Sequence, residues 1–394
     1  MTHFSELGIL PQILTVLDQL KFTIPTPIQH QSIPPGIAGK DIMGIAQTGT
    51  GKTLAFGIPM IQRLHSMGGR GLILLPTREL ALQADEMLQK IGRAFGMYTA
   101  VLIGGESMHK QISALRRNPK IILATPGRLL DHLRQRLVTL REVKILVLDE
   151  ADRMLDMGFT PQINQIMKVI PTERQTLLYS ATMPKGIVNL ATSYMKLPVR
   201  VEVAPSGTAA EKVEQEIIIV EKSGKMAQLE SVLQENPGTA LVFSRTKWGA
   251  RQICQALNVK GYKAAEIHAN RSLRQRKDAL EGFKRGRYEV LVATDIAARG
   301  IDVVNIGVVI NYDLPDNSED YIHRIGRTGR AGREGKAVSF ATPDQKMDIR
   351  DIEKLMRKSL KVTSKVANVR WDPSDTKPSG QKPKPRYGRY RRNF

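Results

Sequence analysis

Short runs of apolar, often β-branched residues recur along the 394-residue chain, and amphipathic segments of helical length separate them. In the first half these runs cover residues 41–45, 71–75, 99–103, 120–124, 144–148 and 175–179. Strands that alternate with helices form parallel sheets, and strands covered on both faces are apolar throughout. The pattern therefore predicts an α/β domain with a mostly parallel sheet flanked by helices.

The same pattern begins again in the second half, with apolar runs at residues 216–220, 239–243, 263–267, 288–293, 307–311 and 336–341. Small and turn-prone residues at 204–210 separate the two sets and are typical of a flexible linker. We therefore expect two domains, followed by a tail. Their predicted bounds are 1–204 and 213–360 for the domains, 205–212 for the linker and 361–394 for the tail.

Composition excludes several classes of protein. The single cysteine, Cys254, cannot form an intramolecular disulfide or a zinc site built from several thiolates. No stretch approaches 18 consecutive apolar residues, and the chain starts with Glu6, Pro11 and Asp18 in place of a basic and apolar signal sequence. We expect a folded cytoplasmic protein with no membrane-spanning segment.

The charge of the chain favours a polyanionic partner. Lysine plus arginine number 59 against 38 acidic residues, a formal net charge of +21, which favours nucleic acid first and an anionic membrane surface second. Residues 377–394 contain no acidic residue and seven basic ones, namely Lys377, Lys382, Lys384, Arg386, Arg389, Arg391 and Arg392. With Tyr387 and Tyr390 among these arginines, the tail is expected to be disordered and to bind single strands by stacking and phosphate contact. A tail that only aids solubility is the alternative.

Residues 46–53, Ala-Gln-Thr-Gly-Thr-Gly-Lys-Thr, lie between an apolar run and an apolar helical segment, as a phosphate-binding loop does. The glycines let backbone N–H groups surround phosphate oxygens, Lys52 supplies a positive charge and the Thr53 hydroxyl is a magnesium ligand. Ala46 stands where the general motif has glycine. The other loop residues expected at the nucleotide are Thr48, Gly49, Thr50 and Gly51.

A second signal is the pair Asp149 and Glu150, which follows the apolar run at 144–148. In an open parallel sheet this position lies at the carboxyl edge, beside the phosphate loop. Asp149 is expected to hold Mg²⁺ through water, and Glu150 to orient or deprotonate the attacking water. Acidic residues at a helix start are also common on surfaces, but phosphoryl transfer needs both halves of this arrangement. Together with Lys52 and Thr53 they predict an NTPase.

Residues 149–152, Asp-Glu-Ala-Asp, and the order of motifs from Phe4 to about Ala341 resemble those of the DEAD-box ATP-dependent RNA helicases, of bacterial type. The resemblance implies two tandem RecA-like domains, ATP and Mg²⁺ as cofactors and RNA as partner. In the motif that reads adenine, Gln29 would bond the base edge and Phe4 or Phe22 would stack on it. An amide offers a donor and an acceptor, which matches adenine and disfavours guanine. Lys21 stands where the family usually has glycine.

The resemblance also implies nucleotide contacts in the second domain. Arg327 and Arg330 would be arginine fingers, which neutralise charge on the transferring phosphoryl group. Gly300 and Asp302 would contact the nucleotide, with the Asp302 carboxylate at the ribose, and Thr294 would contact the RNA backbone. Because the fingers and the phosphate loop belong to different domains, hydrolysis is expected to require the domains to close. The residues implied in coupling closure to RNA are Asp152, Ser180, Thr182 and His323.

Further RNA contacts are implied for loops that follow strands. They are Pro76, Thr77, Arg78, Gly104, Gly105, Thr125, Gly127 and Arg128 in the first domain, with Arg245 and Arg276 in the second. Hydroxyls, glycine N–H groups and arginines bind the sugar-phosphate backbone without reading sequence, so binding should be sequence-tolerant and weaken with salt. Near Arg276, Ala269 and Leu273 replace the family's usual Gly and Gln.

The expected function is RNA-stimulated ATP hydrolysis coupled to domain closure and to local, non-processive unwinding of short RNA duplexes. An ATPase that remodels RNA–protein complexes would carry identical motifs, and ribonucleoprotein or ribosome-assembly complexes are expected partners. An ATP-gated RNA clamp without turnover is disfavoured by the intact Lys52, Glu150, Arg327 and Arg330. A DNA translocase is a further alternative, because these motifs do not report on the 2′-hydroxyl.

Overall fold

The computed structural model describes residues 3–47, 49–203, 213–295, 306–329 and 335–366. Its strands form two sheets of seven strands each, and the described strand pairs are parallel. The carboxyl ends of parallel strands lie at one edge of a sheet, so the loops that follow them are neighbours. This edge is where the predicted chemistry of each half gathers.

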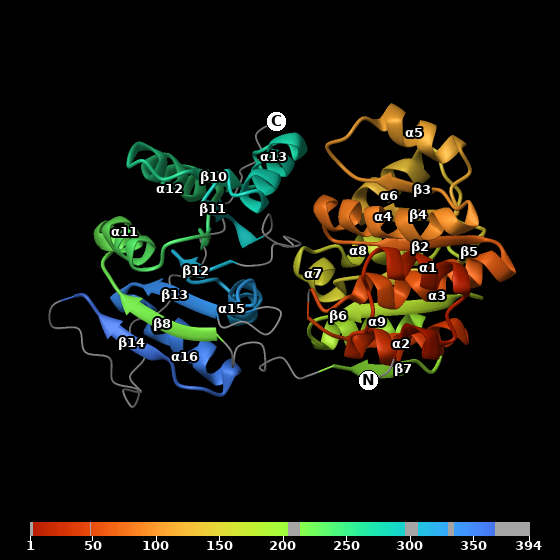
Figure 1. Ribbon diagram of the computed structural model, residues 1–394, viewed down its shortest axis with the longest axis horizontal. Helices are drawn as coiled ribbons and strands as arrows, with labels where there is room; N and C mark the ends of the chain where they lie inside the picture. The colour runs from red at the N-terminus through yellow and green to blue at the C-terminus, as the bar shows by residue number, and fades with distance from the viewer. Residues whose placement is uncertain (1–2, 48, 204–212, 296–305, 330–334, 367–394) are drawn as a thin grey trace, which may run out of the picture. The chain divides into compact units, whose positions relative to one another are not determined.

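The first sheet has the order β3-β4-β2-β5-β6-β1-β7 (Figure 1). Its strands are β1 (Ile42–Ile45), β2 (Arg70–Leu74), β3 (Thr99–Leu102), β4 (Ile121–Ala124), β5 (Val143–Leu148), β6 (Gln175–Ser180) and β7 (Val199–Glu202). The helices of this half are α1 (Pro11–Gln19), α2 (Pro27–Ile37), α3 (Lys52–Met67), α4 (Arg78–Gly92), α5 (Met108–Arg116), α6 (Pro126–Arg134), α7 (Ala151–Asp156), α8 (Thr160–Met167) and α9 (Lys185–Tyr194).

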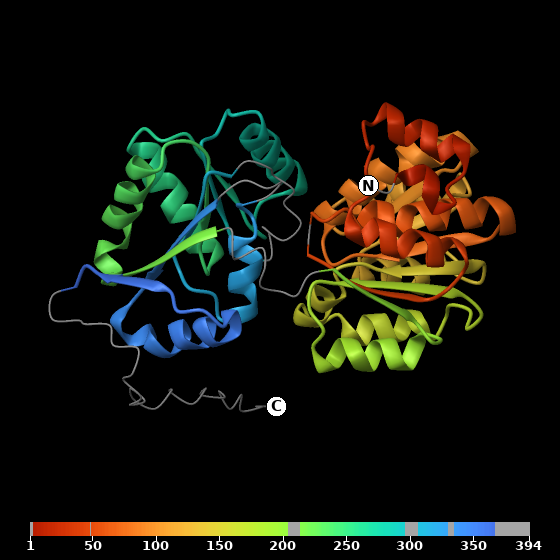
Figure 2. The ribbon, with the colours of Figure 1, turned by 60° about the horizontal axis from the view of Figure 1, so that its bottom comes forward.

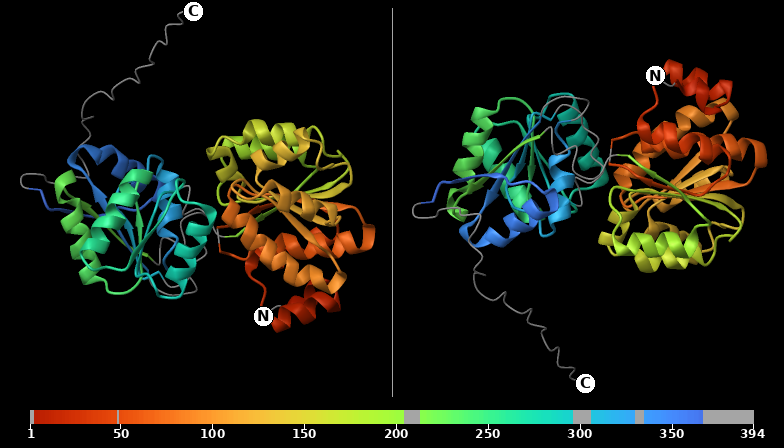
Figure 3. Two further views of the ribbon diagram at one scale, coloured as in Figure 1. Left: turned by 90° about the horizontal axis from the view of Figure 1, so that it is seen from above. Right: turned by 90° about the horizontal axis from the view of Figure 1, so that it is seen from below.

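Alternate residues of these strands enter two separate cores, because successive side chains of a strand point to opposite faces. Ile145 and Val147 of β5 pack in a core shared with α1 to α4, whereas Leu146 and Leu148 pack in a core shared with α6 to α9. Figure 3 shows the sheet between these two layers of helices. Burial on both faces is the reason why the central strands are apolar throughout.

The second sheet has the order β10-β11-β9-β12-β13-β8-β14. Its strands are β8 (Val213–Ile219), β9 (Ala240–Phe243), β10 (Ala264–Ile267), β11 (Val290–Ala293), β12 (Val308–Asn311), β13 (Gly335–Ala341) and β14 (Lys361–Ser364). The helices of this half are α11 (Lys225–Glu235), α12 (Lys247–Val259), α13 (Leu273–Lys284), α15 (Ser318–Ile325) and α16 (Lys346–Met356). Helices α11 and α12 share a core with one face of the sheet, and α15 and α16 lie on the other side (Figure 2).

The two sheets have the same order of strands. Strands β1, β2, β5 and β6 of the first sheet lie at the same positions in the order as β8, β9, β12 and β13, respectively, of the second sheet. The predicted fold class, tandem RecA-like domains built on mostly parallel sheets, is confirmed. Among the described residues no helix is both long and apolar enough to cross a membrane.

The structure adds two strands that the apolar pattern did not predict, β7 and β14, and both lie at a sheet edge. Side chains of β7 are mostly exposed, and those of β14 are at best half-buried, so neither strand requires an apolar run. Strand β14 pairs with β8, with Ser364 opposite Ile219. The second sheet therefore extends past the domain end predicted at residue 360. The predicted linker and the tail beyond residue 366 lie outside the described residues and stay predictions.

Candidate nucleotide and RNA sites

The loop between β1 and α3 has the backbone geometry of a phosphate-binding loop. Gly49 and Gly51 have φ angles of +87° and +92°, which glycine adopts without steric cost. A β-carbon at Gly51 would collide with the amide of Gln29. Lys52 is the first residue of α3, and Thr53 follows it at the helix N-terminus, where N–H groups attract anions. Thr48 lies outside the described residues.

Lys52 is buried and held by two acceptors. Its Nζ donates to the Ala46 carbonyl oxygen at 3.1 Å and to Glu150 Oε1 at 3.0 Å. Burial alone would lower the pKa of Lys52, but the carboxylates of Glu150, Asp149 and Asp152 outweigh burial, so the pKa is raised. Lys52 is therefore protonated at neutral pH and carries the positive charge that can bind a phosphate.

Asp149 and Glu150 follow β5 at the carboxyl edge of the sheet. Glu150 has a φ of +53°, a left-handed conformation that is strained for a residue with a β-carbon and that is concentrated at functional sites. Its backbone N–H donates to Asp149 Oδ1 at 3.0 Å. Burial raises the pKa of Asp149 to about 6, with Lys52 acting in the opposite direction. A carboxylate of this kind binds water and hard cations.

Arg153 is a member of this cluster that the sequence analysis missed. Its Nε lies 2.7 Å from Glu150 Oε2, and the side chains of both residues are 1% exposed. Glu150 thus lies between two cations, Lys52 on one oxygen and Arg153 on the other. The i, i+3 spacing of Glu150, which precedes α7, and Arg153 in the first turn of α7 is the signal that could have identified the pair.

The residues expected to hold Mg²⁺ fit that ion. Mg²⁺ is usually bound by one or two carboxylates together with water and substrate phosphates, and less often by an all-protein cage. Among the described residues no group of three or more His, Cys, Asp or Glu side chains could form such a cage. The Thr53 hydroxyl and the Asp149 carboxylate are hard oxygen donors of the preferred kind. When bound, the ion would neutralise phosphate charge.

Asp152 joins the carboxylate motif to the loop after β6. Its Oδ2 accepts from the backbone N–H groups of Ala181 and Thr182 at 3.0 and 2.9 Å and from Thr182 Oγ1 at 3.0 Å. In return the Asp152 N–H donates to Ser180 Oγ at 3.2 Å. The structure therefore brings together Asp152, Ser180 and Thr182, three of the four residues predicted to couple closure to RNA.

Gln29 contacts the phosphate loop directly. Its Nε2 donates to the Gly51 carbonyl oxygen at 3.0 Å, and its Oε1 accepts from the Thr26 N–H at 2.9 Å. An amide has two N–H donors and two acceptor lone pairs, so one of each remains for a base. Of the two stacking candidates, Phe4 is 4% exposed within the core, whereas Phe22 is only partly buried. The structure therefore favours Phe22.

Seven of the eight residues predicted to contact RNA in the first domain, all except Gly105, line one pocket at the carboxyl edge of β2, β3 and β4. A pocket there is lined by Pro76, Thr77, Arg78, Gly104, Thr125, Gly127 and Arg128. Arg78 lies over Gly104 and Gly105, and a β-carbon at Gly105 would collide with its guanidinium. Met157 and Phe159, which the sequence analysis did not single out, also line this pocket.

The predicted residues of the second half lie on several elements. His323 and Arg327 lie on and just after α15, where Arg327 Nε donates to the His323 carbonyl oxygen at 3.3 Å. Arg276 is on α13, and Thr294 follows β11. Arg245 follows β9, and its Nε is 3.3 Å from Asp316 Oδ1. Gly300, Asp302 and Arg330 lie outside the described residues.

A phosphate loop opposed by a carboxylate pair, in the first of two RecA-like domains, defines a nucleoside triphosphatase. Comparison with known proteins specifies the class. Residues 26–190 match the DEAD/DEAH box helicase family, and residues 224–332 match the helicase conserved C-terminal domain.

Full-length relatives extend the match to most of the chain. The ATP-dependent RNA helicase CshA of Listeria monocytogenes is 43% identical over 91% of this chain and 70% of its own length. The DEAD-box ATP-dependent RNA helicase CshA of Bacillus subtilis is 42% identical, over 91% of this chain and 73% of its own. The structure of S. cerevisiae Dbp5 bound to RNA and ADP BeF3 covers 92% of this chain and 95% of that one, with a TM-score of 0.82 and 30% identity. The chain belongs to the DEAD-box family of ATP-dependent RNA helicases.

The raised pKa of Asp149 predicts a stability change with a defined sign. Because the folded-state pKa is about 6 instead of the ordinary 3.8, the ionised carboxylate destabilises the nucleotide-free protein at pH 7.5. Asp149→Asn should therefore raise the free energy of unfolding by about 2 kcal/mol at pH 7.5, and by less at pH 5, where the parent carboxyl is mostly protonated. ATP hydrolysis should be lost. Denaturant titrations at both pH values measure the difference, with the exposed Asp18→Asn as control. A variant less stable than its parent at pH 7.5 contradicts the expectation.

Proposed function

We propose that ATP and RNA close the two domains on one RNA strand, that closure expels the complementary strand, and that hydrolysis reopens the domains. The observation that carries this proposal is the placement of Lys52, Asp149 and Glu150 on the first sheet, while Arg327 belongs to the second. Charge on a transferring phosphoryl group must be neutralised on several sides. Hydrolysis therefore requires the two domains to come together, and unwinding by this route is local and non-processive.

In the proposed ATP site, Phe22 stacks on adenine, Gln29 bonds its edge, and the 46–53 loop surrounds the phosphates. A bound phosphate competes with Glu150 for Lys52, because both anions need the same buried ammonium. Glu150 is then released from Lys52 to orient the attacking water, while Arg153 keeps it in place. Thr53 and Asp149 hold Mg²⁺ together with the phosphates. Gly300, Asp302, Arg327 and Arg330 complete the site from the second domain.

The proposed RNA path follows the pocket at the carboxyl edge of β2, β3 and β4. Its arginines, hydroxyls and glycine N–H groups bind phosphate and sugar without contacting base edges. Arg245, Arg276 and Thr294 extend the grip in the second domain. Affinity for single strands should fall with salt, with a slope of about 0.7 per phosphate contact.

The basic tail supplies the remaining, less specific affinity. Its arginines and tyrosines suit single strands and structured RNA alike. Ribonucleoprotein or ribosome-assembly complexes in the cytoplasm are the proposed setting, since remodelling uses the same motifs as unwinding. The Asp152, Ser180 and Thr182 contacts support coupling between the carboxylate motif and RNA, with His323 as their proposed counterpart on the second domain.

RNA and DNA single strands of equal length and sequence separate this proposal from a DNA translocase. RNA should stimulate ATP hydrolysis, and DNA should not, because the backbone contacts include the 2′-hydroxyl in a helicase specific for RNA. Steady-state phosphate release measures both rates. Equal stimulation by the two polymers, or hydrolysis at the same rate without either, would overturn the proposal.

Arg330→Ala tests the need for closure. Loss of an arginine finger should reduce RNA-stimulated ATP hydrolysis on the order of a thousandfold, while RNA affinity without nucleotide stays within about twofold. The neighbouring Arg333→Ala removes the same charge and serves as control. An Arg330→Ala variant that hydrolyses ATP at the parent rate would show that hydrolysis does not need an arginine finger from the second domain.

Truncation after Trp371 tests the tail and leaves β14 intact, since that strand ends at Ser364. Duplex RNA affinity should fall at least tenfold at low salt, and the salt slope should decrease by about 0.7 to 0.9 for each phosphate that the tail neutralises. Replacing Tyr387 and Tyr390 by Ala keeps the charge and isolates stacking. Unchanged affinity in the truncated chain would favour the solubility role.

A further inference from the structure

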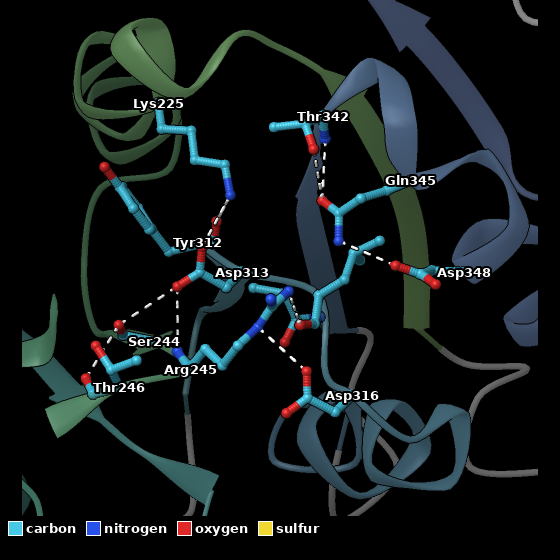
Figure 4. A network of polar contacts seen from close by, with 12 residues as sticks. Lys225, Ser244, Arg245, Thr246, Tyr312, Asp313, Asp316, Thr342, Gln345 and Asp348 are labelled. Carbon is cyan, nitrogen blue, oxygen red and sulfur yellow. Dashed lines mark hydrogen bonds and ion pairs between the residues drawn. The ribbon is translucent and has the colours of Figure 1, made fainter. Parts of the chain in front are cut away.

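A second polar cluster lies at the carboxyl edge of the second sheet, where β8, β9, β12 and β13 end. Lys225, Arg245, Asp313, Thr342 and Asp348 line a pocket there (Figure 4). It lies within one half of the chain, and the predicted nucleotide ligands are not among its lining residues. Its position on the sheet nevertheless corresponds to that of the phosphate site on the first.

Lys225 has the place in the second half that Lys52 has in the first. Each is the first residue of the α-helix that follows the corresponding strand, β8 or β1, although a short 3-10 helix, Lys222–Gly224, precedes α11. Lys52 bonds a backbone carbonyl and Glu150, which follows β5, whereas Lys225 Nζ donates to the Tyr312 carbonyl oxygen at 2.7 Å and to Asp313 Oδ1 at 2.9 Å, just after β12. The buried lysine–carboxylate pair is thus present twice, at equivalent positions.

The second pair is not built to bind phosphate. The loop from β8 to α11, residues 220–224, is described throughout and contains no residue with positive φ. Gly224 has a φ of −85°, so the loop lacks the backbone turn that directs N–H groups at an anion. The Lys225 side chain is 7% exposed and already neutralised by Asp313. The Lys225 charge is therefore paired with Asp313 inside the domain and is not presented to a ligand.

Asp313 in turn holds the loop that follows β9. Asp313 Oδ2 accepts from the Arg245 backbone N–H at 3.1 Å and from Ser244 Oγ at 3.4 Å. Burial alone would raise the pKa of Asp313, but the Lys225 ammonium and the Arg245 N–H outweigh burial, so the pKa is lowered. The carboxylate is therefore ionised at neutral pH and accepts hydrogen bonds from Lys225 and from the 244–246 loop.

Arg324 of α15, the helix that also carries His323, holds the segment that contains Asp313. Arg324 Nη1 donates to the Asp313 carbonyl oxygen at 2.6 Å and to Asn311 Oδ1 at 3.1 Å. Its guanidinium lies over the ring of Phe243, 5.0 Å from the centroid, and Phe243 directly precedes Ser244. The backbone that leads into the 244–246 loop and the Asp313 segment that faces it are thus fixed together.

The Arg245 side chain projects from this fixed backbone. Its Nη2 donates to the Leu314 carbonyl oxygen at 3.2 Å, and 44% of the side chain is exposed. This hydrogen bond and the ion pair with Asp316 orient the guanidinium without covering it. An arginine held in this way loses little conformational freedom when it meets a phosphate.

We infer that Lys225 and Asp313 are positioning residues for RNA binding: the pair holds the 244–246 loop so that Arg245 presents its guanidinium to the RNA backbone. This inference rests on the proposed RNA contact of Arg245 and deepens it. Neither Lys225 nor Asp313 needs to touch RNA or ATP for the effect. The second sheet therefore uses its lysine–carboxylate pair to shape an RNA contact.

The experiment measures single-stranded RNA affinity against salt for Lys225→Met, Asp313→Asn and Arg245→Ala, and for each of the first two combined with Arg245→Ala. Each single variant should bind RNA roughly tenfold more weakly, because Arg245→Ala removes one charge-assisted interaction with the RNA backbone and the other two substitutions misplace the Arg245 guanidinium that makes it. Each should also lower the salt slope by about 0.7, the share of one phosphate contact. Added to Arg245→Ala, the other two substitutions should have no further effect, because they act through the same contact.

Matched variants separate positioning from general damage. Lys222→Met removes an exposed lysine from the same pocket and should bind RNA as the parent does. Lys225→Arg retains a cationic donor and should recover most of the affinity. Binding of a fluorescent ATP analogue should be unchanged in all variants, because the phosphate loop belongs to the other sheet. Asp313→Asn, which has nearly the same shape as the parent side chain but removes the ion pair with Lys225, provides the readout if Lys225→Met folds poorly.

The outcomes distinguish this inference from the proposal on which it rests. If Arg245→Ala binds RNA with parent affinity and salt slope, the proposed RNA contact itself is wrong. If Arg245→Ala weakens binding while Lys225→Met and Asp313→Asn do not, the positioning role is overturned and the contact stands. A further decrease in affinity when Lys225→Met is added to Arg245→Ala overturns it as well, because the lysine would then act elsewhere.

Discussion

Parallel pairing of strands is the constraint on which the whole molecule depends. Strands that run in the same direction must end at the same edge, so each loop that follows a strand is brought beside the others whatever its distance in sequence. In the first half this places Lys52, after β1, within 3.0 Å of Glu150, after β5, across 98 positions of chain. The Asp152 contacts to the loop after β6 follow from the same geometry.

The buried charges at that edge compensate one another. Glu150 meets Lys52 and Arg153, and Asp152 accepts three hydrogen bonds from the 181–182 segment. A buried charge must be compensated by an opposite charge or by hydrogen bonds. When one member of a buried ion pair is removed, the other is left as an unpaired buried charge, which destabilises the folded protein. Asp149 is the member of this cluster that is least compensated, as its raised pKa indicates, which fits a side chain suited to a cation.

The second sheet repeats the order of the first but differs at the equivalent edge. Positive-φ glycines precede Lys52, whereas the described residues 220–224 before Lys225 have negative φ, so only the first lysine faces a space shaped for phosphate. In the second sheet the Asp313 carboxylate is the anion that pairs with the lysine, in place of a phosphate. One framework thus supports two uses of the same ion pair, and the difference between them lies in the backbone of a short loop.

The sequence by itself determined twelve of the fourteen described strands, the phosphate loop and the carboxylate motif, because buried strands and phosphate chemistry leave strong local patterns. It did not determine the strands β7 and β14, whose side chains are mostly exposed or only half-buried and need no apolar run. It left Phe4 and Phe22 as stacking candidates, and the burial of Phe4 supports Phe22. Arg153 and the Lys225–Asp313 pair were decided only by tertiary structure, since a buried charge is recognised by what surrounds it, and those neighbours are distant in sequence.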